Sequence, residues 1–221
     1  MSFYFRSVPD IDYVNRFPNA KISEYIRSKN LFTRVKIRDE IFQNLMYFEK
    51  YNVIGDERPD NVAQKFYGDP TFEWVVFLAN NIVNVYDEWP LSQQSFENFL
   101  IEKYGTNDKI NQVRFYESKE VLTSNGITIL EKGLIVPSNY SVTFFDAALG
   151  REVIKTNITN AVTNYEFESR INDAKSNIFV IKPDFLQLVV DDVVRAIEYK
   201  EGSTQFVSRT LKKTDNIRLF Q

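Results

Sequence analysis

The sequence predicts an α+β fold in which a helical region is followed by a β-rich region that a terminal helix closes. Three patterns carry this prediction. Capping residues precede apolar helical stripes between residues 51 and 104, short β-type runs separated by turns follow from residue 107, and the longest amphipathic pattern covers residues 183–199. We therefore expect four segments: an N-terminal arm with a strand (1–38), a helical core (39–106), a β-rich region with its helix (107–202) and an extended tail (203–221).

The first segment begins as an arm without a clear period, with aromatic residues spaced by two prolines. Its last eight residues, Leu31–Arg38, alternate between apolar and basic side chains, which predicts a strand with one basic face. The basic residues of that face are Arg34, Lys36 and Arg38. A short helix is predicted for residues 39–50.

Residues 51–104 carry the clearest local signals. A short strand at Tyr51–Ile54 is followed by a helix that Asp60 caps and Gly68 ends, because glycine accepts the left-handed conformation of a helix C-terminus. Asp69 and Pro70 then start a second helix, and a third is predicted between a Ser92 cap and Gly105.

From residue 107 the pattern becomes β-type. Short strands are predicted at 113–116, 121–122, 127–130, 134–136 and 141–145, with Asn125-Gly126 as a hairpin turn. A further strand pair is predicted from 164–170 and 177–182, before Pro183 opens the terminal helix.

The composition excludes several function classes. The chain of 221 residues has no Cys and no His, which rules out disulfides, thiolate nucleophiles, Ser-His-Asp catalysis and zinc sites built on these residues. A net charge of −3 gives no general attraction to nucleic acid or to an anionic membrane. We expect no cofactor, no bound metal, no nucleic-acid partner and no membrane partner.

No export or membrane segment is evident. The first ten residues lack the apolar stretch of a signal peptide, and the longest apolar run is far shorter than the roughly 20 residues that span a bilayer. We expect a soluble protein that is made in a cytoplasm.

Two family resemblances overlap at residues 51–82. The first is to the LysM module, in which a strand ending in Gly-Asp precedes two helices. The residues that carry this resemblance are Tyr51, Val53, Gly55, Asp56, Val62, Ala63, Tyr67, Gly68, Asp69, Trp74, Leu78, Asn80, Asn81 and Ile82. The resemblance ends there, because acidic and aromatic residues 83–90 stand where the second strand of the module is expected.

The wider resemblance covers most of the chain. It rests on the order of Phe32-Thr-Arg34-Val-Lys36, Arg58-Pro59, Phe66–Asp69, Trp89–Ser92 and the Tyr165–Ile178 stretch. These motifs resemble the LysM-like baseplate wedge subunit of contractile-tailed, T-even-type bacteriophages. The β region 119–161 and the tail match least.

That resemblance implies a structural protein of the virion, located in the tail baseplate and made in the cytoplasm of the host bacterium. Its partners would be other wedge proteins and adjacent wedges, with six copies around the tail and contact with the central hub. The implied role is binding without catalysis. We expect the exposed anchors of this binding to be Phe3, Tyr4, Phe5, Arg34, Lys36, Arg38, Tyr86 and Trp89.

Other interpretations of the same residues remain open at this stage. A LysM module of a cell-wall-associated protein would bind peptidoglycan between the loops 55–60 and 80–90, with Trp74 as a sugar-stacking residue. We favour a core position for Trp74, because it shares a helical stripe with Leu78 and Ile82. A wall hydrolase would need a carboxylate pair from Glu57 or Asp56 with Asp87 or Glu88, and the sequence shows no fixed separation for them.

Overall fold

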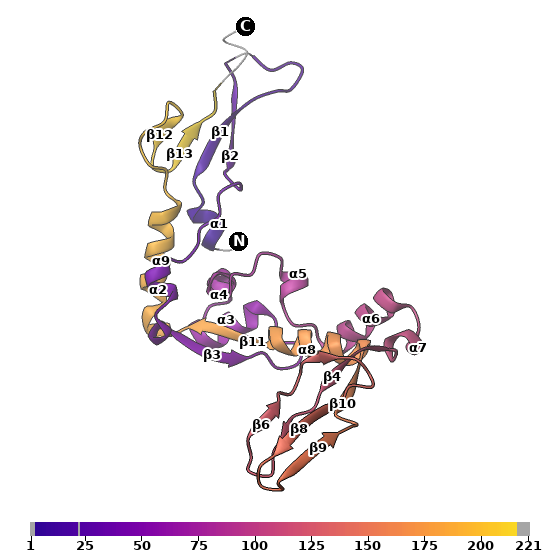
Figure 1. Ribbon diagram of the computed structural model, residues 1–221. Coiled ribbons are helices and arrows are strands. Elements are labelled where there is room, and N and C mark those ends of the chain that lie inside the picture. The colour runs from indigo at the N-terminus through magenta and orange to yellow at the C-terminus, as the bar shows by residue number, and fades with distance from the viewer. Residues whose placement is uncertain (1–2, 22, 216–221) are drawn as a thin grey trace. The chain divides into compact units, whose positions relative to one another are not determined.

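The computed structural model describes residues 3–21 and 23–215, with only the backbone described for Phe3. The chain folds as two units, which are considered separately. Unit 1 combines Met1–Trp89 with Asn177–Gln221, and unit 2 is the intervening stretch Pro90–Ser176. Both contain helices and small sheets (Figure 1), in agreement with the predicted α+β class.

Unit 1 interleaves short helices and strands from both ends of the chain. Its helical elements are α1 (Phe3–Ser7), α2 (Asp39–Phe42), η1 (Leu45–Tyr47), α3 (Pro59–Tyr67), η2 (Pro70–Phe72), α4 (Glu73–Ala79), α5 (Val85–Glu88) and α9 (Pro183–Ile197). Its strands are β1 (Asp10–Val14), β2 (Tyr25–Lys29), β3 (Phe48–Asn52), β11 (Asn177–Ile181), β12 (Phe206–Ser208) and β13 (Leu211–Lys213).

Two sheets in unit 1 join segments that lie far apart in the sequence. A four-stranded sheet has the order β12-β13-β1-β2, with β1 and β13 parallel and the other pairs antiparallel. A two-stranded sheet pairs β3 with β11 in antiparallel register, from Phe48 opposite Ile181 to Asn52 opposite Asn177. The C-terminal part of the chain therefore completes structures that the N-terminal part begins.

Two apolar clusters form the core of unit 1. The larger one joins the inward face of α9, including Val189 and Val193, to Trp74 and Val75 of α4. The smaller one surrounds Val62 and includes Trp89. A fully buried aliphatic side chain stabilises by about 1.5–3 kcal/mol. These contacts explain why the α9 pattern, the strongest amphipathic stretch of the sequence, forms a helix as predicted.

The N-terminal segment differs from its prediction. The structure has no strand at 31–38 within the described residues, although Val35 and Ile37 are buried as the alternation implied. Residues 31–32 form a turn and 33–38 have no regular structure, so the alternation indicated the burial of Val35 and Ile37 and not strand pairing. The arm also contains regular structure, because β1 and β2 pair and carry the ion pair Asp12–Arg27 at 2.9 Å.

The helix predicted for residues 39–50 is interrupted. α2 ends at Phe42, and the side chain of Asn44 then accepts a hydrogen bond from the Met46 N–H, which caps the separate turn η1. β3 begins at Phe48, three residues before the predicted strand.

The helices predicted near residues 60–67 and 93–104 are confirmed, but the Asp60 cap is wrong: α3 starts at Pro59 after Arg58, which makes no side-chain cap hydrogen bond, so Asp60 is the second residue of the helix. The second predicted helix is divided into the turn η2 and α4. α3 ends at Gly68, whose φ of 72° is left-handed, and the Asp69 carboxylate accepts a hydrogen bond from Thr71 N–H at 2.8 Å. In unit 2, α6 (Gln93–Tyr104) starts after Ser92, whose side chain accepts from the Ser95 N–H, and it ends before Gly105.

Unit 2 contains three small sheets and three helices among its described residues. The helices are α6, α7 (Asn107–Ile110) and α8 (Asn164–Ser176). The strands are β4 (Val113–Ser118), β5 (Val121–Leu122), β6 (Thr128–Leu130), β7 (Ile135–Val136), β8 (Val142–Asp146), β9 (Arg151–Lys155) and β10 (Thr159–Thr163). They pair as β10-β4-β7, β5-β6 and β8-β9, and the β5–β6 hairpin contains the predicted Asn125-Gly126 turn.

The strand predicted at 164–170 is wrong, because α8 occupies these residues. The signal for a helix was a reciprocal capping pair. The Glu166 N–H donates to Thr163 Oγ1, and the Thr163 N–H donates to Glu166 Oε2, as in a capping box. The strand predicted at 177–182 exists as β11, but it pairs with β3 of unit 1.

A buried carboxylate organises unit 2. Glu168 on α8 accepts hydrogen bonds from Lys103 Nζ and Tyr104 Oη, both at 2.7 Å. Burial alone would raise the pKa of Glu168, but these hydrogen bonds and the cations Lys103 and Arg114 lower it. The first and last parts of the unit are also tied, since the Asn172 side chain bonds to both the N–H and the carbonyl oxygen of Leu91.

The tail contains two short strands, β12 and β13, where an extended segment without a period was expected; its residues 216–221 lie outside the described part.

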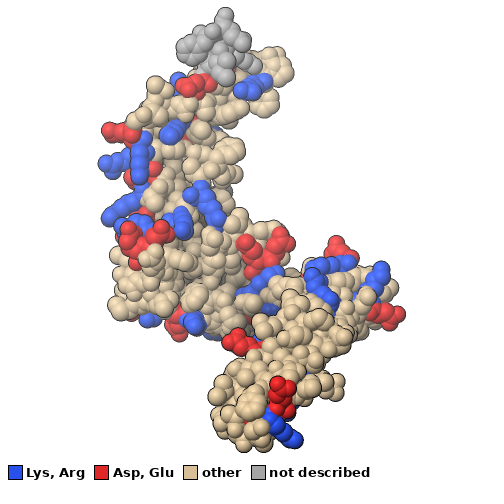
Figure 2. Space-filling view, in the orientation of Figure 1, with Lys and Arg blue, Asp and Glu red and all other residues tan. Residues whose placement is uncertain are grey.

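Figure 2 shows one face of unit 1 on which Lys and Arg side chains gather, with Asp and Glu side chains among them. Basic side chains are thus mixed with acidic ones on the face of unit 1 that this view shows.

Candidate protein-binding surface

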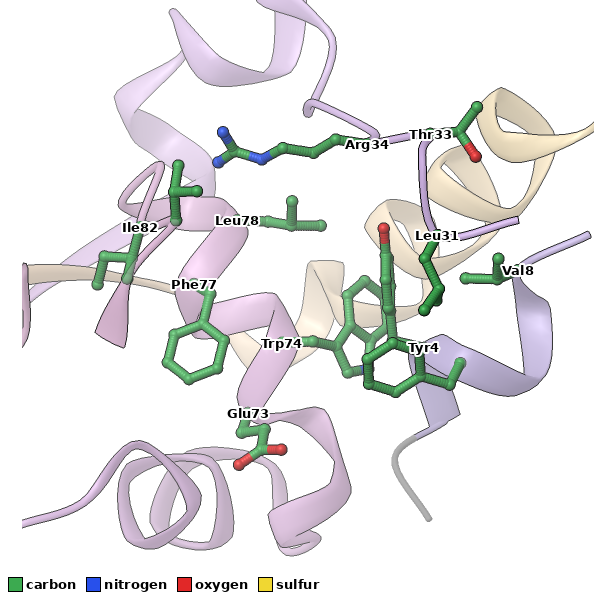
Figure 3. A pocket seen from close by; sticks show the side chains of 12 residues that line it. Tyr4, Val8, Leu31, Thr33, Arg34, Glu73, Trp74, Phe77, Leu78 and Ile82 are labelled. Atoms are coloured by element: carbon green, nitrogen blue, oxygen red, sulfur yellow. The ribbon is translucent and has the colours of Figure 1, made fainter. Parts of the chain in front are cut away.

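Described residues of unit 1 form an apolar groove. Its volume is about 450 Å³, and α1, α4 and the loop after β2 contribute its walls (Figure 3). The residues that line it are Tyr4, Phe5, Val8, Leu31, Thr33, Arg34, Glu73, Trp74, Phe77, Leu78, Ile82 and Val83. Most of these are hydrophobic, as is typical of sites that bind apolar groups.

Helix α4 supplies the base of the groove. Trp74, Phe77 and Leu78 are spaced three and four residues apart, so they lie on one face of the helix. Trp74 is a core residue, as predicted, and it also forms part of the groove wall. The Tyr4 ring of α1 packs against the Trp74 ring with centroids 5.6 Å apart, and Phe5 contacts Tyr4 edge-on.

Two charged side chains lie at opposite ends of the groove in Figure 3. Arg34 donates one hydrogen bond, from Nη2 to Asn81 Oδ1 at 3.1 Å, and has no ion pair with the described residues. Glu73 stands at the first position of α4, and the described part of the chain offers it no ion pair either. The groove can thus offer both a cation and a carboxylate to a ligand.

Large apolar side chains are exposed in and beside the groove. Leu31 is 67% exposed, its neighbour Phe32 is 96% exposed, and Val83 is 66% exposed. Burial of any of these side chains against a partner would stabilise the complex, because apolar surface would be removed from water. Aromatic anchors that fill pockets on a partner are the usual hot spots of protein interfaces.

The structure brings three of the predicted interface residues together. Tyr4, Phe5 and Arg34 all line the groove, and Tyr86 is exposed elsewhere on unit 1. The side chain of Phe3, another predicted interface residue, lies outside the described part of the chain. Lys36 and Arg38 are used within the chain, in ion pairs with Asp39 at 3.0 Å and with Asp192 at 2.6 Å.

Trp89 corrects the predicted interface. The side chain is only 7% exposed, and its indole N–H donates to the carbonyl oxygen of Glu57 at 3.0 Å. It packs in the cluster around Val62. Because Trp89 is buried within unit 1, it is a core residue and not an exposed anchor.

The residues of the LysM-like motif lie on consecutive elements of unit 1. β3 and the turn after it hold Tyr51, Val53, Gly55 and Asp56; α3 and its end hold Val62, Ala63, Tyr67, Gly68 and Asp69; α4 and the following turn hold Trp74, Leu78, Asn80, Asn81 and Ile82. Gly55 and Gly68 both have positive φ, and Asn81 has a φ of 55°, a conformation that Asn tolerates better than most residues.

Asn80 has a role that the sequence did not reveal. Its side-chain amide donates to the carbonyl oxygens of Val76 and Phe179, both at 2.8 Å, and accepts from the Phe179 N–H at 2.7 Å. The side chain thereby joins the end of α4 to β11. Because Phe179 lies 99 residues further along the chain, no local signal could have indicated this partner.

Glu57 and Glu88, two of the four carboxylates considered for a hydrolase, accept local hydrogen bonds. Glu57 accepts from Tyr51 Oη and lies 3.7 Å from Lys65 Nζ. Burial, together with the hydrogen bond to Glu57, raises the pKa of Tyr51. Glu88 accepts from the N–H groups of Val83 and Asn84, which fixes the loop that carries it.

Within residues 3–21 and 23–215, no group of three or more Asp or Glu side chains is arranged to hold a metal ion. Among the helices of the same residues, none combines the length and the apolar character needed to cross a membrane.

Comparison with known proteins gives two matches. The sequence model of the family described as Base plate wedge protein 53 matches residues 3–123, which is more than half of the chain. Baseplate wedge protein gp53 of Enterobacteria phage T4 is 31% identical over 75 residues. That alignment spans 29% of this chain and 38% of the T4 protein, so the similarity covers well under two thirds of the relative.

Proposed function

The chain belongs to the Base plate wedge protein 53 family, and from this premise we propose that it is a structural subunit of the baseplate wedge in a phage tail. The observation that carries the proposal is the family match over residues 3–123, because this range contains every residue that lines the groove. The virion tail baseplate would be its location, and the cytoplasm of the host bacterium its place of synthesis.

In this proposal the chain acts by binding alone. Its partners are other wedge proteins and the adjacent wedges, in six copies per baseplate and with contact to the central hub. The groove and the exposed Leu31, Phe32 and Val83 support this role, since they offer an apolar surface larger than a single residue. The engagement of Glu57 and Glu88 in local hydrogen bonds supports a function without catalysis.

We further propose that β3, α3, α4 and β11 form a LysM-like core. The order strand-helix-helix-strand, with the two strands antiparallel, supports this interpretation. The second strand of this core does not follow α4 closely in the sequence, because the residues of unit 2 are inserted before β11. The Asn80 hydrogen bonds to Phe179 would fix the late strand to the helices.

A peptidoglycan-binding function is the less supported alternative. In a LysM module the glycan would lie between the loops 55–60 and 80–90. Here the Trp89 indole joins these two loops through its hydrogen bond to Glu57 and is itself buried. A carbonyl oxygen and an aromatic ring that a sugar could have used are therefore already paired with each other.

The groove is tested with a pair of matched variants. Leu31→Glu places a charge on the groove, whereas Leu45→Glu places the same charge at a leucine that is outside the groove and 72% exposed. Both side chains are exposed, so we expect both variants to fold like the parent chain.

Each variant is co-expressed with the other wedge proteins of the same phage, and the purified complexes and phage particles are assayed for the chain. We expect Leu31→Glu to be depleted from complexes and Leu45→Glu to be retained. Absence of the unmodified chain from purified particles would contradict the proposed function. Equal retention of both variants would show that the groove is not the contact.

A further inference from the structure

The groove and the last residues of the sequence are complementary in chemistry. The groove has apolar walls, the carboxylate of Glu73 at one end and the guanidinium of Arg34 at the other. The sequence after the last described residue reads Asn216-Ile-Arg-Leu-Phe-Gln221, in which Arg218 stands among three large apolar residues. Of the stretches that the structure does not describe, only this one is longer than two residues.

The dimensions agree as well. Glu73 and Ala79, the first and last residues of α4, are six residues apart, or about 9 Å at the 1.5 Å rise of a helix, and Asn81, which binds Arg34, follows two residues later. An extended peptide advances about 3.3 Å per residue, so three or four residues would span the distance between the two charges. A peptide with a basic residue beside Glu73 would place the apolar residues that follow it opposite the apolar walls of the groove.

The direction of β13 indicates which molecule supplies the segment. β13 runs parallel to β1, with Lys213 beside Asp12, and Thr214 continues in this direction by two hydrogen bonds to the Asp12 carbonyl oxygen. The groove is lined by α1, which precedes β1. The chain therefore leaves β13 heading away from its own groove and would have to reverse at once to enter it.

We propose, on the basis of the proposed wedge function, that the groove binds residues 216–221 of a second copy of this chain. Each copy then donates a segment on one side and receives one on the other. Such a head-to-tail contact closes into a ring when the rotation between copies permits it. The contact would join the copies of this subunit in adjacent wedges directly, in addition to contacts through other wedge proteins.

The first test is a mixing experiment with the full chain. One variant, Leu219→Asp, carries a defective segment and an intact groove, and the other, Leu31→Glu, carries an intact segment and a blocked groove. Sedimentation velocity should show concentration-dependent association of the unmodified chain, monomers for each variant alone, and a dimer when the two variants are mixed. Circular dichroism must show that both variants melt like the parent, and Leu45→Glu should associate normally.

The second test is a charge exchange. A labelled peptide of residues 214–221 is titrated into the Leu219→Asp chain and followed by fluorescence anisotropy. We expect Glu73→Lys to weaken binding about fivefold, as for an exposed ion pair, and a peptide with Arg218→Glu to recover the loss. A Leu219→Asp peptide should bind at least tenfold more weakly than the unmodified one.

Several outcomes would overturn the proposal. A monomeric parent chain with a peptide that binds only when the chain's own segment is removed would place the segment in its own groove. A peptide that does not bind, while Leu31→Glu is still lost from wedge complexes, would mean that another wedge protein fills the groove. In that case the proposed function stands and the second-copy inference fails.

Discussion

Replacement of Trp89 by alanine should strongly destabilise unit 1. The Trp89 side chain is only 7% exposed, and it packs with Val53, Val62 and Ile178. Removing a buried Trp side chain costs about 3–5 kcal/mol. The Glu57 carbonyl oxygen also loses its indole donor, which adds about 1 kcal/mol where water does not replace it. The total is a large part of the roughly 5–15 kcal/mol that stabilises a typical domain.

The measurement is urea unfolding followed by far-UV circular dichroism, with two reference variants. Trp89→Phe keeps an aromatic ring and loses the N–H, so it should cost about 1–2 kcal/mol. Tyr86→Ala, on the short helix α5 that ends just before Trp89, is 90% exposed and should stay within about 0.5 kcal/mol of the parent. If Trp89→Ala unfolds at the same urea concentration as Tyr86→Ala, the burial of Trp89 and the closure of the two loops are refuted.

Three further substitutions test the fold. Gly68→Ala should cost about 1 kcal/mol, because Gly68 has a φ of 72° and nothing within 4 Å of an added Cβ, so backbone strain acts alone; Gly68→Asn should cost less, as thermal unfolding would show. Asn80→Ala should cost about 2 kcal/mol in urea unfolding, because two carbonyl oxygens and the Phe179 N–H lose their partner. Glu168→Gln should destabilise unit 2 by about 2 kcal/mol at pH 7, since it leaves Lys103 unpaired. Because the pKa of Glu168 is lower in the folded chain than its ordinary value of 4.5, the ionised carboxylate stabilises the fold at pH values above 4.5. This stabilisation is lost as the pH falls through the pKa of the folded chain, so the free energies of unfolding of parent and variant should converge in acid. A constant difference down to pH 3 would contradict this linkage.

Local signals explain which elements could be predicted from the sequence. α6 lies between its Ser92 cap and Gly105, and α9 starts at Pro183, as the sequence signals predict. α3 ends at Gly68 as predicted, although it begins at Pro59 and not after an Asp60 cap. The Thr163–Glu166 capping pair was an equally local signal for α8 and was overlooked in favour of a β-type pattern. The alternation at 31–38 was correct about burial for Val35 and Ile37 but not for Leu31, and strand pairing depends on a neighbour that the sequence does not reveal.

The candidate surface could be predicted only in part, for a similar reason. Tyr4, Phe5 and Arg34 were selected as aromatic or basic residues, and the fold gathers them in one groove. Nothing local distinguished Trp89 from Tyr86, two aromatic residues three positions apart in the same loop. The partner of the Trp89 indole lies 32 residues earlier, and the cluster around Val62 that buries it includes Ile178 from β11.

The late position of β11 has an entropic cost that the structure keeps small. Asn52 and its partner Asn177 are 125 residues apart, compared with about 40 if the strand had followed α5 directly, and this increase in loop length costs only about 1 kcal/mol. The cost falls further once unit 2 has folded, because the Asn172 side chain joins the last turns of α8 to Leu91 near the start of the unit. The long intervening stretch then behaves as a short connection between α5 and β11. An interrupted core of this kind can therefore retain a two-stranded sheet of only five residue pairs, provided that unit 2 forms first or at the same time.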